Sequence, residues 1–481
     1  MRDLILGTDH LDLHTLVAWA DAPMRISLAP GVRDALAAKA AEARRAAAEG
    51  TAYGRTTGVG ANRDRGADDR DGGHGMRLVR SHASGWGPDM GERLARATML
   101  VRANQLSHPG SGIPVEVVDG LLGAMADGRT PLVRTFGSLG TGDIASLAEL
   151  ALCLRGERAW RDGTVAAYVD NFDASAALSF ISSNATTIAI AALAVHDLAQ
   201  VIDASLAPLA LGAAAIRANG QQWSTVAAST RPSVGVDRTM GRLRAALDGT
   251  TFEQARTQDP LSWRVAPFTL GPLLEALDEV TVEIERAADA RAENPRFADG
   301  AVWHHGAFQH TALGLRLDLL RLAVVQWAST CVARIVKLND PAYTGQDRFL
   351  AHGPAGSSGT MVLEYTATSA LETLRTLADP TSRDTASISI GTEDHASFAT
   401  RGAVAATESI LALSAVVGAE LVVAARALRG ATDVSVGGAL ARAVEMCRVL
   451  PDALDDRSLT DDVEAAVGAL PALAAWARTL G

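Results

Sequence analysis

The sequence predicts a mostly α-helical protein with a smaller N-terminal portion that mixes helices and strands. Of the 481 residues, 48% are hydrophobic but only 4% are aromatic. The alanine and leucine that supply most of this apolar content favour helices over strands. Apolar residues also recur at helical spacing over several long stretches. Helices of that length usually pack in a bundle.

The first fifty residues predict a short strand followed by helices, which end in an alanine- and arginine-rich run over residues 37–50. Residues 51–75 are rich in glycine, aspartate and arginine and predict a long loop. Loops of this length are usually functional lids or disordered. Whether residues 66–75 close as a lid stays open at this point.

The clearest helical stripes lie in the middle of the chain. One stripe has steps of four, three and four residues: Leu273, Leu277, Val280 and Ile284. Another runs over about six turns: Leu313, Leu317, Leu320, Val324, Trp327, Cys331 and Ile335. Helices are also expected over residues 361–377 and 404–428, where alanine and β-branched residues are closely spaced, as in helices buried on several sides.

These patterns divide the chain into three parts. We expect an N-terminal portion over residues 1–200, a central long-helix bundle over residues 201–430 and a C-terminal helical segment over residues 431–481. No internal repeat is evident in the sequence.

Charge excludes several function classes. The formal net charge is -11 and the pI is about 5.5, which gives nucleic-acid binding no electrostatic support. Lys39 and Lys337 are the only lysines. Schiff-base chemistry and a phosphate loop of the Gly-Lys-Ser/Thr type therefore have almost no place in this chain.

The remaining composition predicts a cytoplasmic protein. Cys153, Cys331 and Cys447 are too few and too far apart for a disulfide framework, which suits a reducing compartment. Residues 1–10 contain early acids and no apolar run of signal length. Glu420 and Arg426 interrupt the apolar stretch 410–428, so no membrane span is expected.

Candidate chemistry begins at a glycine-flanked tyrosine in the sequence Tyr-Gly-Arg-Thr-Thr-Gly-Val-Gly, residues 53–60. Glycines let a loop approach a ligand closely, and a phenol with a lowered pKa can act as an acid or base. Taken alone, the segment fits an ordinary glycine-rich turn better. Further motifs follow it in order: Ser-His-Ala-Ser-Gly at 81–85, Arg-Ala-Asn-Gln-Leu at 102–106 and Gly-Ser-Leu-Gly-Thr-Gly-Asp at 137–143.

This ordered set resembles the histidine/phenylalanine ammonia-lyase and aminomutase family. Matching landmarks continue along the chain: Ser-Asn-Ala-Thr at 183–186, Gln-Asp-Pro-Leu-Ser-Trp-Arg at 258–264, Asn-Pro at 294–295, Gly-Ala-Phe at 306–308 and Glu-Asp-His at 393–395. The resemblance covers roughly residues 3 to 430. It implies an ammonia-lyase-like helical bundle that assembles as a homotetramer, with each active site shared between subunits.

The resemblance also implies roles for individual residues. In that family an Ala-Ser-Gly tripeptide cyclises to methylidene-imidazolone (MIO), the electrophile that lets ammonia leave. By position, Tyr53 corresponds to the catalytic base and Arg264 to the clamp on the substrate carboxylate, chemistry that suits a guanidinium. The other implied site residues are His82 near the substrate side chain and Asn184, Gln258, Leu261, Phe308 and Glu393 lining the pocket.

Two of these residues could instead have purely structural roles. His82 could be a satisfied core histidine, and Arg264 could form a structural ion pair. His304, His305 and His310 match no standard zinc-helix spacing, so no metal site is expected.

The segment that should form MIO departs from the family pattern. Gly140-Thr141-Gly142 replaces Ala-Ser-Gly in a loop one residue shorter, and threonine stands at the dehydrating serine. Cyclisation here would give a bulkier ethylidene analogue, so we expect no MIO cofactor.

Two more departures accompany this one. Leu261 replaces a tyrosine, which removes a hydroxyl donor, and Thr373 stands where the family commonly has a glutamate, with Glu372 one position away on another helix face.

Three functions therefore remain open. The first is a carbon–nitrogen lyase or aminomutase acting on an amino acid. The second is an MIO-independent elimination, addition, isomerisation or cyclisation of a related carboxylate, in a specialised pathway. In this case the backbone amides of residues 140–142 would stabilise an anion. The third is a non-catalytic relative that binds a small ligand.

Overall fold

A computed structural model describes residues 3–8 and 10–481. Residues 1, 2 and 9, part of the N-terminal segment expected to lack a signal sequence, lie outside the described residues. The chain forms two compact units, each drawn from three segments. Unit 1 comprises Met1–His196, Thr281–Leu317 and Pro380–Val404, and unit 2 comprises Asp197–Val280, Asp318–Asp379 and Ala405–Gly481. The expected division at residues 200 and 430 stays a prediction.

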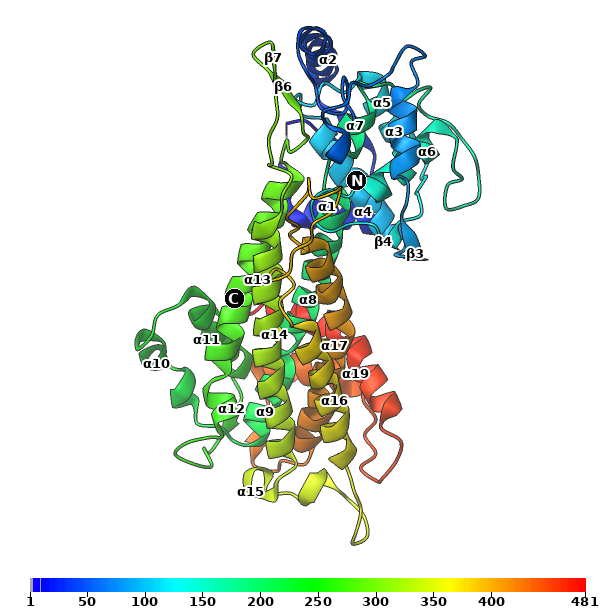
Figure 1. Ribbon diagram of the computed structural model, residues 1–481. Helices are drawn as coiled ribbons and strands as arrows, with labels where there is room; N and C mark the ends of the chain where they lie inside the picture. Colours follow the sequence, from blue (N-terminus) through cyan, green and yellow to red (C-terminus); the bar gives the residue numbers. More distant parts are fainter. Residues whose placement is uncertain (1–2, 9) are drawn as a thin grey trace. The chain divides into compact units, whose positions relative to one another are not determined.

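Unit 1 combines short helices with three small strand pairs (Figure 1). Strands β1 (Leu4–Leu6) and β2 (Ile26–Leu28) pair in parallel, whereas β3 (Trp86–Asp89) with β4 (Arg134–Phe136) and β6 (Arg296–Ala298) with β7 (Ala301–Trp303) are antiparallel. Its helices are α1 (Leu13–Asp21), α2 (Val32–Glu49), α3 (His74–His82), α4 (Glu92–Leu106), α5 (Val115–Ala126), α6 (Ile144–Arg155) and α7 (Ala177–Ile181).

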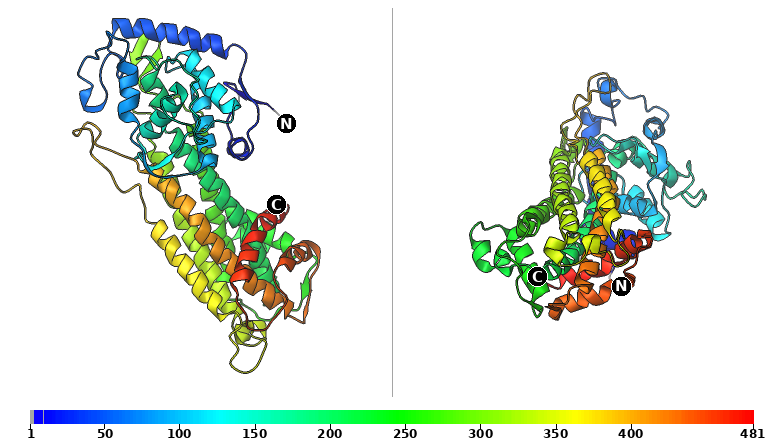
Figure 2. Two further views of the ribbon diagram at one scale, coloured as in Figure 1. Left: turned by 90° about the vertical axis from the view of Figure 1, so that its right-hand side faces the viewer. Right: turned by 90° about the horizontal axis from the view of Figure 1, so that it is seen from below.

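Unit 2 is a helical bundle in which α13, α14, α16 and α17 run side by side (Figures 1 and 2). The longest helices, α8 (Ala185–Ala204), α13 (Ala266–Ala288), α14 (Thr311–Leu338) and α17 (Ala399–Arg429), each contain residues of both units. One strand pair, β5 (Thr251–Phe252) with β8 (Val434–Ser435), completes unit 2. Its other helices are α9 (Leu206–Ala215), α10 (Thr225–Ser229), α11 (Val234–Leu247), α12 (Leu261–Arg264), α15 (Pro341–Thr344), α16 (Met361–Leu377), α18 (Gly438–Met446) and α19 (Thr460–Arg478).

The predicted mostly α class is confirmed, and so are the two apolar stripes. Every residue of the stripe on α13 and of the longer stripe on α14 is buried. The predicted helix over 361–377 coincides with α16, and the one over 404–428 lies inside α17. Helix α3, by contrast, was not predicted, because its nine residues are fewer than the roughly 11 to 18 over which a helical period is recognised.

The expectation that charged residues rule out a membrane span by composition was wrong. Three helical stretches, Ala177–Ala215, Thr311–Leu338 and Ala399–Arg429, are long and apolar enough to cross a membrane. In their most apolar windows, 94%, 44% and 83% of the residues, respectively, are buried inside the protein. In the first and third stretches, most of the apolar residues are buried in the protein interior. One or two charged residues within such a stretch do not make it too polar to span a membrane.

Candidate active site

Tyr53 lies in a tight loop directly after α2. Its backbone N–H donates to Nε2 of His304 at 3.2 Å, and its phenol oxygen accepts from the N–H of Gly60 at 2.6 Å. Burial raises the pKa of the phenol, as does the negative charge of Glu393, while the Gly60 N–H and Arg63 act in the opposite direction. The phenol is therefore protonated at neutral pH in this chain, and a cationic substrate beside it would favour the phenolate.

Arg55 connects this loop to neighbouring segments by hydrogen bonds. Its Nη2 donates to the carbonyl oxygens of Ser111 and Gly112 at 2.6 and 3.1 Å and to Ser179 Oγ at 3.0 Å. The guanidinium also lies over the ring of Phe297, 4.4 Å from its centroid. Burial lowers the pKa of Arg55 to about 10, so it stays charged at neutral pH. Nothing in the sequence distinguished Arg55 from a solvent-facing arginine.

The segment that ends at Glu393 packs against the tyrosine loop. Ser389 Oγ accepts from the N–H of Ala61 at 2.9 Å, and residues 388 and 393 form an isolated antiparallel bridge. A Cβ on Gly60, whose φ is +57°, would lie 2.3 Å from Ser389 Oγ and 3.8 Å from Glu393 Oε1. Glycine is therefore favoured at position 60, and the close fit brings Glu393 beside the phenol of Tyr53.

The altered loop follows β4 and leads into α6. Its Gly140 has a φ of +79°, and a Cβ there would lie 2.3 Å from Ser397 Oγ and 2.9 Å from the backbone nitrogen of Ala399. The carbonyl oxygen of Gly140 accepts from Ser397 Oγ at 2.7 Å. Among the described residues, the N–H groups of Thr141 and Gly142 have no hydrogen-bond acceptor.

A buried polar network holds the far end of this loop. The carboxylate of Asp143 accepts from Thr187, through its N–H at 2.6 Å and its Oγ1 at 2.8 Å, and from Ser138 Oγ. Thr400 joins the network by contacts to the hydroxyls of Ser138 and Thr187 at 2.9 and 2.7 Å. Burial raises the pKa of Asp143, although these donors favour the charged form.

The loop does not fit the ordinary precursor of MIO. That precursor begins with alanine, and the packing of Gly140 against Ser397 and Ala399 leaves no room for a methyl group in this conformation. Its second residue, Thr141, carries an extra methyl on the carbon that must lose water. Whether an MIO group forms in this chain stays a prediction that the mass of the intact protein tests.

Asn184 precedes α8 and is 2% exposed. Its Nδ2 donates to the backbone carbonyl of Phe308. A carbonyl oxygen can only accept, and this fixes which end of the Asn184 amide faces Phe308. The amide oxygen Oδ1 is buried and has no partner among the described residues. Buried polar atoms are nearly always paired in proteins, so this acceptor is available for a donor on a ligand.

His82 ends α3, and its Nδ1 lies 2.8 Å from the carbonyl oxygen of Leu78. Because that oxygen can only accept, Nδ1 carries a proton, and a neutral His82 presents Nε2 as an acceptor. The side chain is partly exposed, so His82 is not the buried core histidine of the structural alternative.

The remaining predicted site residues lie in unit 2. Leu261 and Arg264 begin and end α12, with Leu261 exposed. No ion pair is found for Arg264 among the described residues, so the alternative of a structural ion pair finds no support there. Gln258 precedes Asp259, whose carboxylate accepts from the N–H of Asn219 at 2.7 Å. Neither unit alone contains every predicted site residue.

The histidines near residue 305 do not form a metal site in the part of the chain that the structure describes, where no cluster of three or more His, Cys, Asp or Glu side chains occurs. His304 serves the tyrosine loop instead. His310 is buried, and burial lowers its pKa to about 4, so it is neutral at physiological pH.

Comparison with known proteins agrees with these motifs. The aromatic amino acid lyase family matches residues 11–448. Histidine ammonia-lyase of Symbiobacterium thermophilum is 31% identical, covering 97% of this chain and 96% of that protein. Two similar solved structures are the ergothioneine-degrading enzyme ergothionase of Treponema denticola (TM-score 0.91, 23% identity, 98% and 99% coverage) and tyrosine aminomutase of Streptomyces globisporus (TM-score 0.89, 22%, 99% and 98%). The chain belongs to the aromatic amino acid lyase family of carbon–nitrogen lyases.

Proposed function

We propose that this enzyme eliminates a nitrogen leaving group from an α-amino acid or a related α-substituted carboxylate without an MIO group. The observation that supports the proposal best is the fit of Gly140 against Ser397, which disfavours the alanine of the usual precursor. Without an electrophile to activate it, a plain ammonium is a poor leaving group. The substrate class we favour therefore carries a nitrogen that leaves more readily, such as a fully alkylated ammonium.

In this reaction Tyr53 takes the proton from the β-carbon at its phenol oxygen. The electrons of that C–H bond form the Cα=Cβ double bond, and the amine leaves with the electrons of the C–N bond. The positive charge of such a substrate would lower the pKa of Tyr53 from its raised value and so generate the base. The phenol oxygen already accepts one N–H, from Gly60, which also favours the phenolate.

We assign substrate binding to four sets of groups. Arg264 has no ion pair within the described residues and would hold the carboxylate in a bidentate manner. The free N–H groups of Thr141 and Gly142 would stabilise negative charge that develops during proton removal. The unpaired Oδ1 of Asn184 would accept a hydrogen bond from a donor on the substrate's side chain, since a fully alkylated ammonium has none, and the exposed Leu261 would offer an apolar surface.

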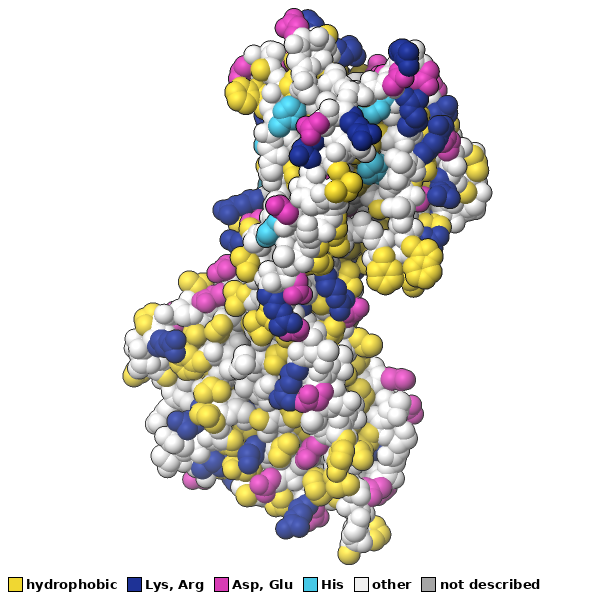
Figure 3. All heavy atoms as spheres, in the orientation of Figure 1, with side chains coloured by type: hydrophobic (Ala, Val, Ile, Leu, Met, Phe, Trp, Pro, Cys, Tyr) yellow, Lys and Arg dark blue, Asp and Glu magenta, His cyan; other side chains and the backbone are white. Residues whose placement is uncertain are grey.

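A homotetramer with shared active sites is part of the same proposal. Leu319, Leu322 and Val336 are exposed and fall within about 100° of one another around α14, and Val362 and Tyr365 are exposed on α16. Apolar side chains lie between charged ones over these helices in Figure 3. Exposed apolar faces of this kind often mark interfaces between subunits, and sharing would supply residues from other copies to each site.

We also propose a cytoplasmic enzyme that does not enter a membrane. Two observations support this: the three cysteines are buried and unpaired, and the most apolar windows of the first and third candidate spans lie largely inside the protein.

Two measurements test the proposed reaction. Intact mass spectrometry should give the mass of the encoded chain, and a loss of two water molecules would contradict an MIO-independent mechanism. Pairs of substrates should then be compared. The two members of a pair are the same aromatic amino acid with a primary α-ammonium and with an α-trimethylammonium group. The absorbance of the unsaturated product measures the turnover of each member. We expect turnover of the trimethylated member alone. Faster turnover of the primary amine by an unmodified chain would refute the leaving-group argument.

A further inference from the structure

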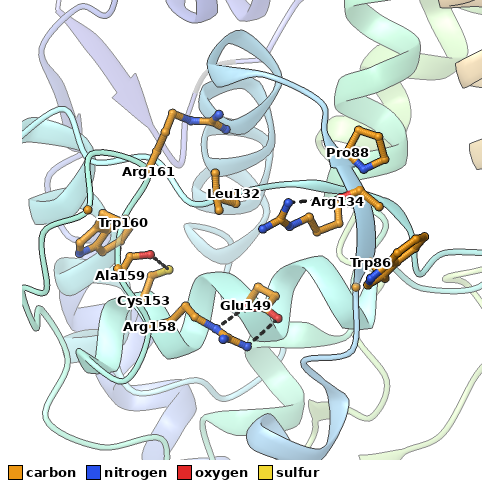
Figure 4. Close-up of a pocket in the computed structure, with 13 residues that line it drawn as sticks. Trp86, Pro88, Leu132, Arg134, Glu149, Cys153, Arg158, Ala159, Trp160 and Arg161 are labelled. Atoms are coloured by element: carbon orange, nitrogen blue, oxygen red, sulfur yellow. Dashed lines mark hydrogen bonds and ion pairs between the residues drawn. The ribbon is translucent and has the colours of Figure 1, made fainter.

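One cavity is lined by none of the predicted active-site residues. It measures about 750 Å³ and lies in unit 1, within the size range of small-molecule sites. Its walls come from β3, β4, the end of α6 and the loop of residues 158–163. Figure 4 shows the side chains of Arg134, Arg158 and Arg161 around it.

Two of these three arginines are neutralised by acidic partners. Arg158 pairs with Glu149 through Nε and Nη2 at 2.9 and 3.2 Å. Arg161 pairs with Asp89, to which its Nη2 donates at 3.0 Å. Glu149 is the only acidic residue that lines the cavity. Among the described residues that line the cavity, no further carboxylate remains for a third cation.

Arg134 is that third cation. Among the described residues its hydrogen-bond acceptor is the backbone carbonyl of Gly87, at 3.2 Å from Nη1, and no ion pair involves it. In Figure 4 its guanidinium points into the cavity, towards Leu132. In a chain with a net charge of -11, this cavity thus holds an arginine whose charge no acidic side chain balances.

Apolar and aromatic surface surrounds the charge. Trp86 is 75% exposed and its indole stacks on Phe136, with ring centroids 6.4 Å apart and planes 11° apart. Pro88, Leu132 and Trp160 add further apolar lining. An exposed tryptophan beside an unpaired arginine matches a ligand that has a flat apolar body and an anionic end.

We propose that this cavity binds a small aromatic carboxylate, with the carboxylate on Arg134 and the ring against Trp86. Arginine recognises carboxylates in a bidentate manner, and the indole face accommodates a flat ring. A smaller cavity shares Gly85, Arg134 and Glu149 with this one and extends to Gly137 and Ser138, so the site also borders the start of the altered loop. The proposal is independent of the reaction at Tyr53.

The test uses cinnamate as the ligand and isothermal titration calorimetry of the assembled full-length protein. Arg134→Gln should weaken cinnamate binding about tenfold or more, since a hydrogen-bonded charge pair is lost. Arg80→Gln serves as the matched control, because Arg80 is exposed, pairs with Glu157 and lies outside the cavity. Cinnamamide, which has the same shape but no charge, should bind as weakly to wild type as cinnamate binds to Arg134→Gln.

The variant Arg264→Ala distinguishes cinnamate binding in this cavity from binding at the candidate active site, because it removes the proposed carboxylate clamp in unit 2. Cinnamate binding should persist in Arg264→Ala and weaken when Arg134→Gln is added. Loss of all binding in Arg264→Ala alone would overturn the proposal, as would unchanged binding in Arg134→Gln or no binding to wild type at millimolar cinnamate. If Arg134→Gln fails to fold, Trp86→Ala at an exposed position replaces it, and unchanged affinity of that variant would equally refute the site.

Discussion

The tyrosine loop and the altered loop of unit 1 are built in the same way, yet they differ in how much change they tolerate. In each, a glycine with positive φ packs against a serine hydroxyl: Gly60 against Ser389 and Gly140 against Ser397, both at 2.3 Å from an added Cβ. Ser389 is only partly buried, whereas Ser397 is 2% exposed. The second contact therefore has less room to adjust.

The difference extends to the groups that each loop presents. The tyrosine loop retains a side chain that can carry a proton, held by Gly60 and beside Glu393. The altered loop presents backbone N–H groups at Thr141 and Gly142 in place of a fitted cofactor precursor. In the proposed reaction, proton transfer by Tyr53 is the step that the family resemblance implies, and activation of the leaving group is the step that differs.

The largest effect is expected at Tyr53. Tyr53→Phe removes the proposed base and should lower kcat by about 100-fold or more, the usual contribution of a positioned base. Steady-state kinetics with the true substrate measure this, and thermal unfolding checks that the loop survives without the acceptor for the Gly60 N–H. Tyr365→Phe, at an exposed tyrosine on α16, is the matched control and should behave as wild type. Equal activity of both variants would exclude Tyr53 as the base.

A pH effect is expected from His310, which follows the segment where His304 accepts from the N–H of Tyr53 and the carbonyl of Phe308 accepts from Asn184. Its pKa is about 4 in the folded protein and 6.5 in the unfolded chain. The unfolded state therefore binds more protons between these values, so stability is full above pH 6.5 and falls as the pH drops to 4. The loss should reach about 3 kcal/mol.

Urea unfolding at pH 7 and at pH 4.5 measures this contribution. His310→Gln should lose less stability over that interval than wild type, while His14→Gln, at an exposed histidine, should lose as much as wild type. An unchanged pH dependence in His310→Gln would show that another group is responsible.

Gly140→Ala tests the more buried of the two glycine contacts. The methyl group would meet a buried hydroxyl and the backbone nitrogen of Ala399, so destabilisation of about 1–3 kcal/mol is expected. Ser397→Gly in the same chain should recover part of this loss, and the double-mutant cycle by urea unfolding measures the coupling. Destabilisation that Ser397→Gly does not relieve would locate the strain elsewhere in the loop.

Gly60→Ala is the matched change in the tyrosine loop and should be the mildest. Its main obstacle is the partly exposed Ser389, which can rotate, leaving a cost of about 1 kcal/mol that comes chiefly from the positive φ. The same unfolding measurement applies, with Ser389→Gly as the relieving partner. A cost larger than that of Gly140→Ala would reverse the proposed order of the two loops.

Much of the fold was predictable because helix stripes are local. Leu273 and Ile284 are buried on α13 as their spacing requires, and α16 begins and ends where the pattern does. Arg134 and Arg55, in contrast, look like ordinary surface arginines in the sequence. Arg55 is buried by groups from residues 111, 112 and 179, and Arg134 stands unpaired because other arginines take the nearby acids.

The sequence by itself determined the helical class, the family resemblance and the identity of the residues that depart from it, since these depend on residue type and spacing along the chain. Only the tertiary structure decided that Gly140 meets Ser397, that Glu393 lies beside Tyr53 and that the amide oxygen of Asn184 is left unpaired. Each of these depends on packing between segments more than a hundred residues apart. Such contacts leave no periodic signal in the sequence, because they depend on how the intervening chain folds and brings the two partners together.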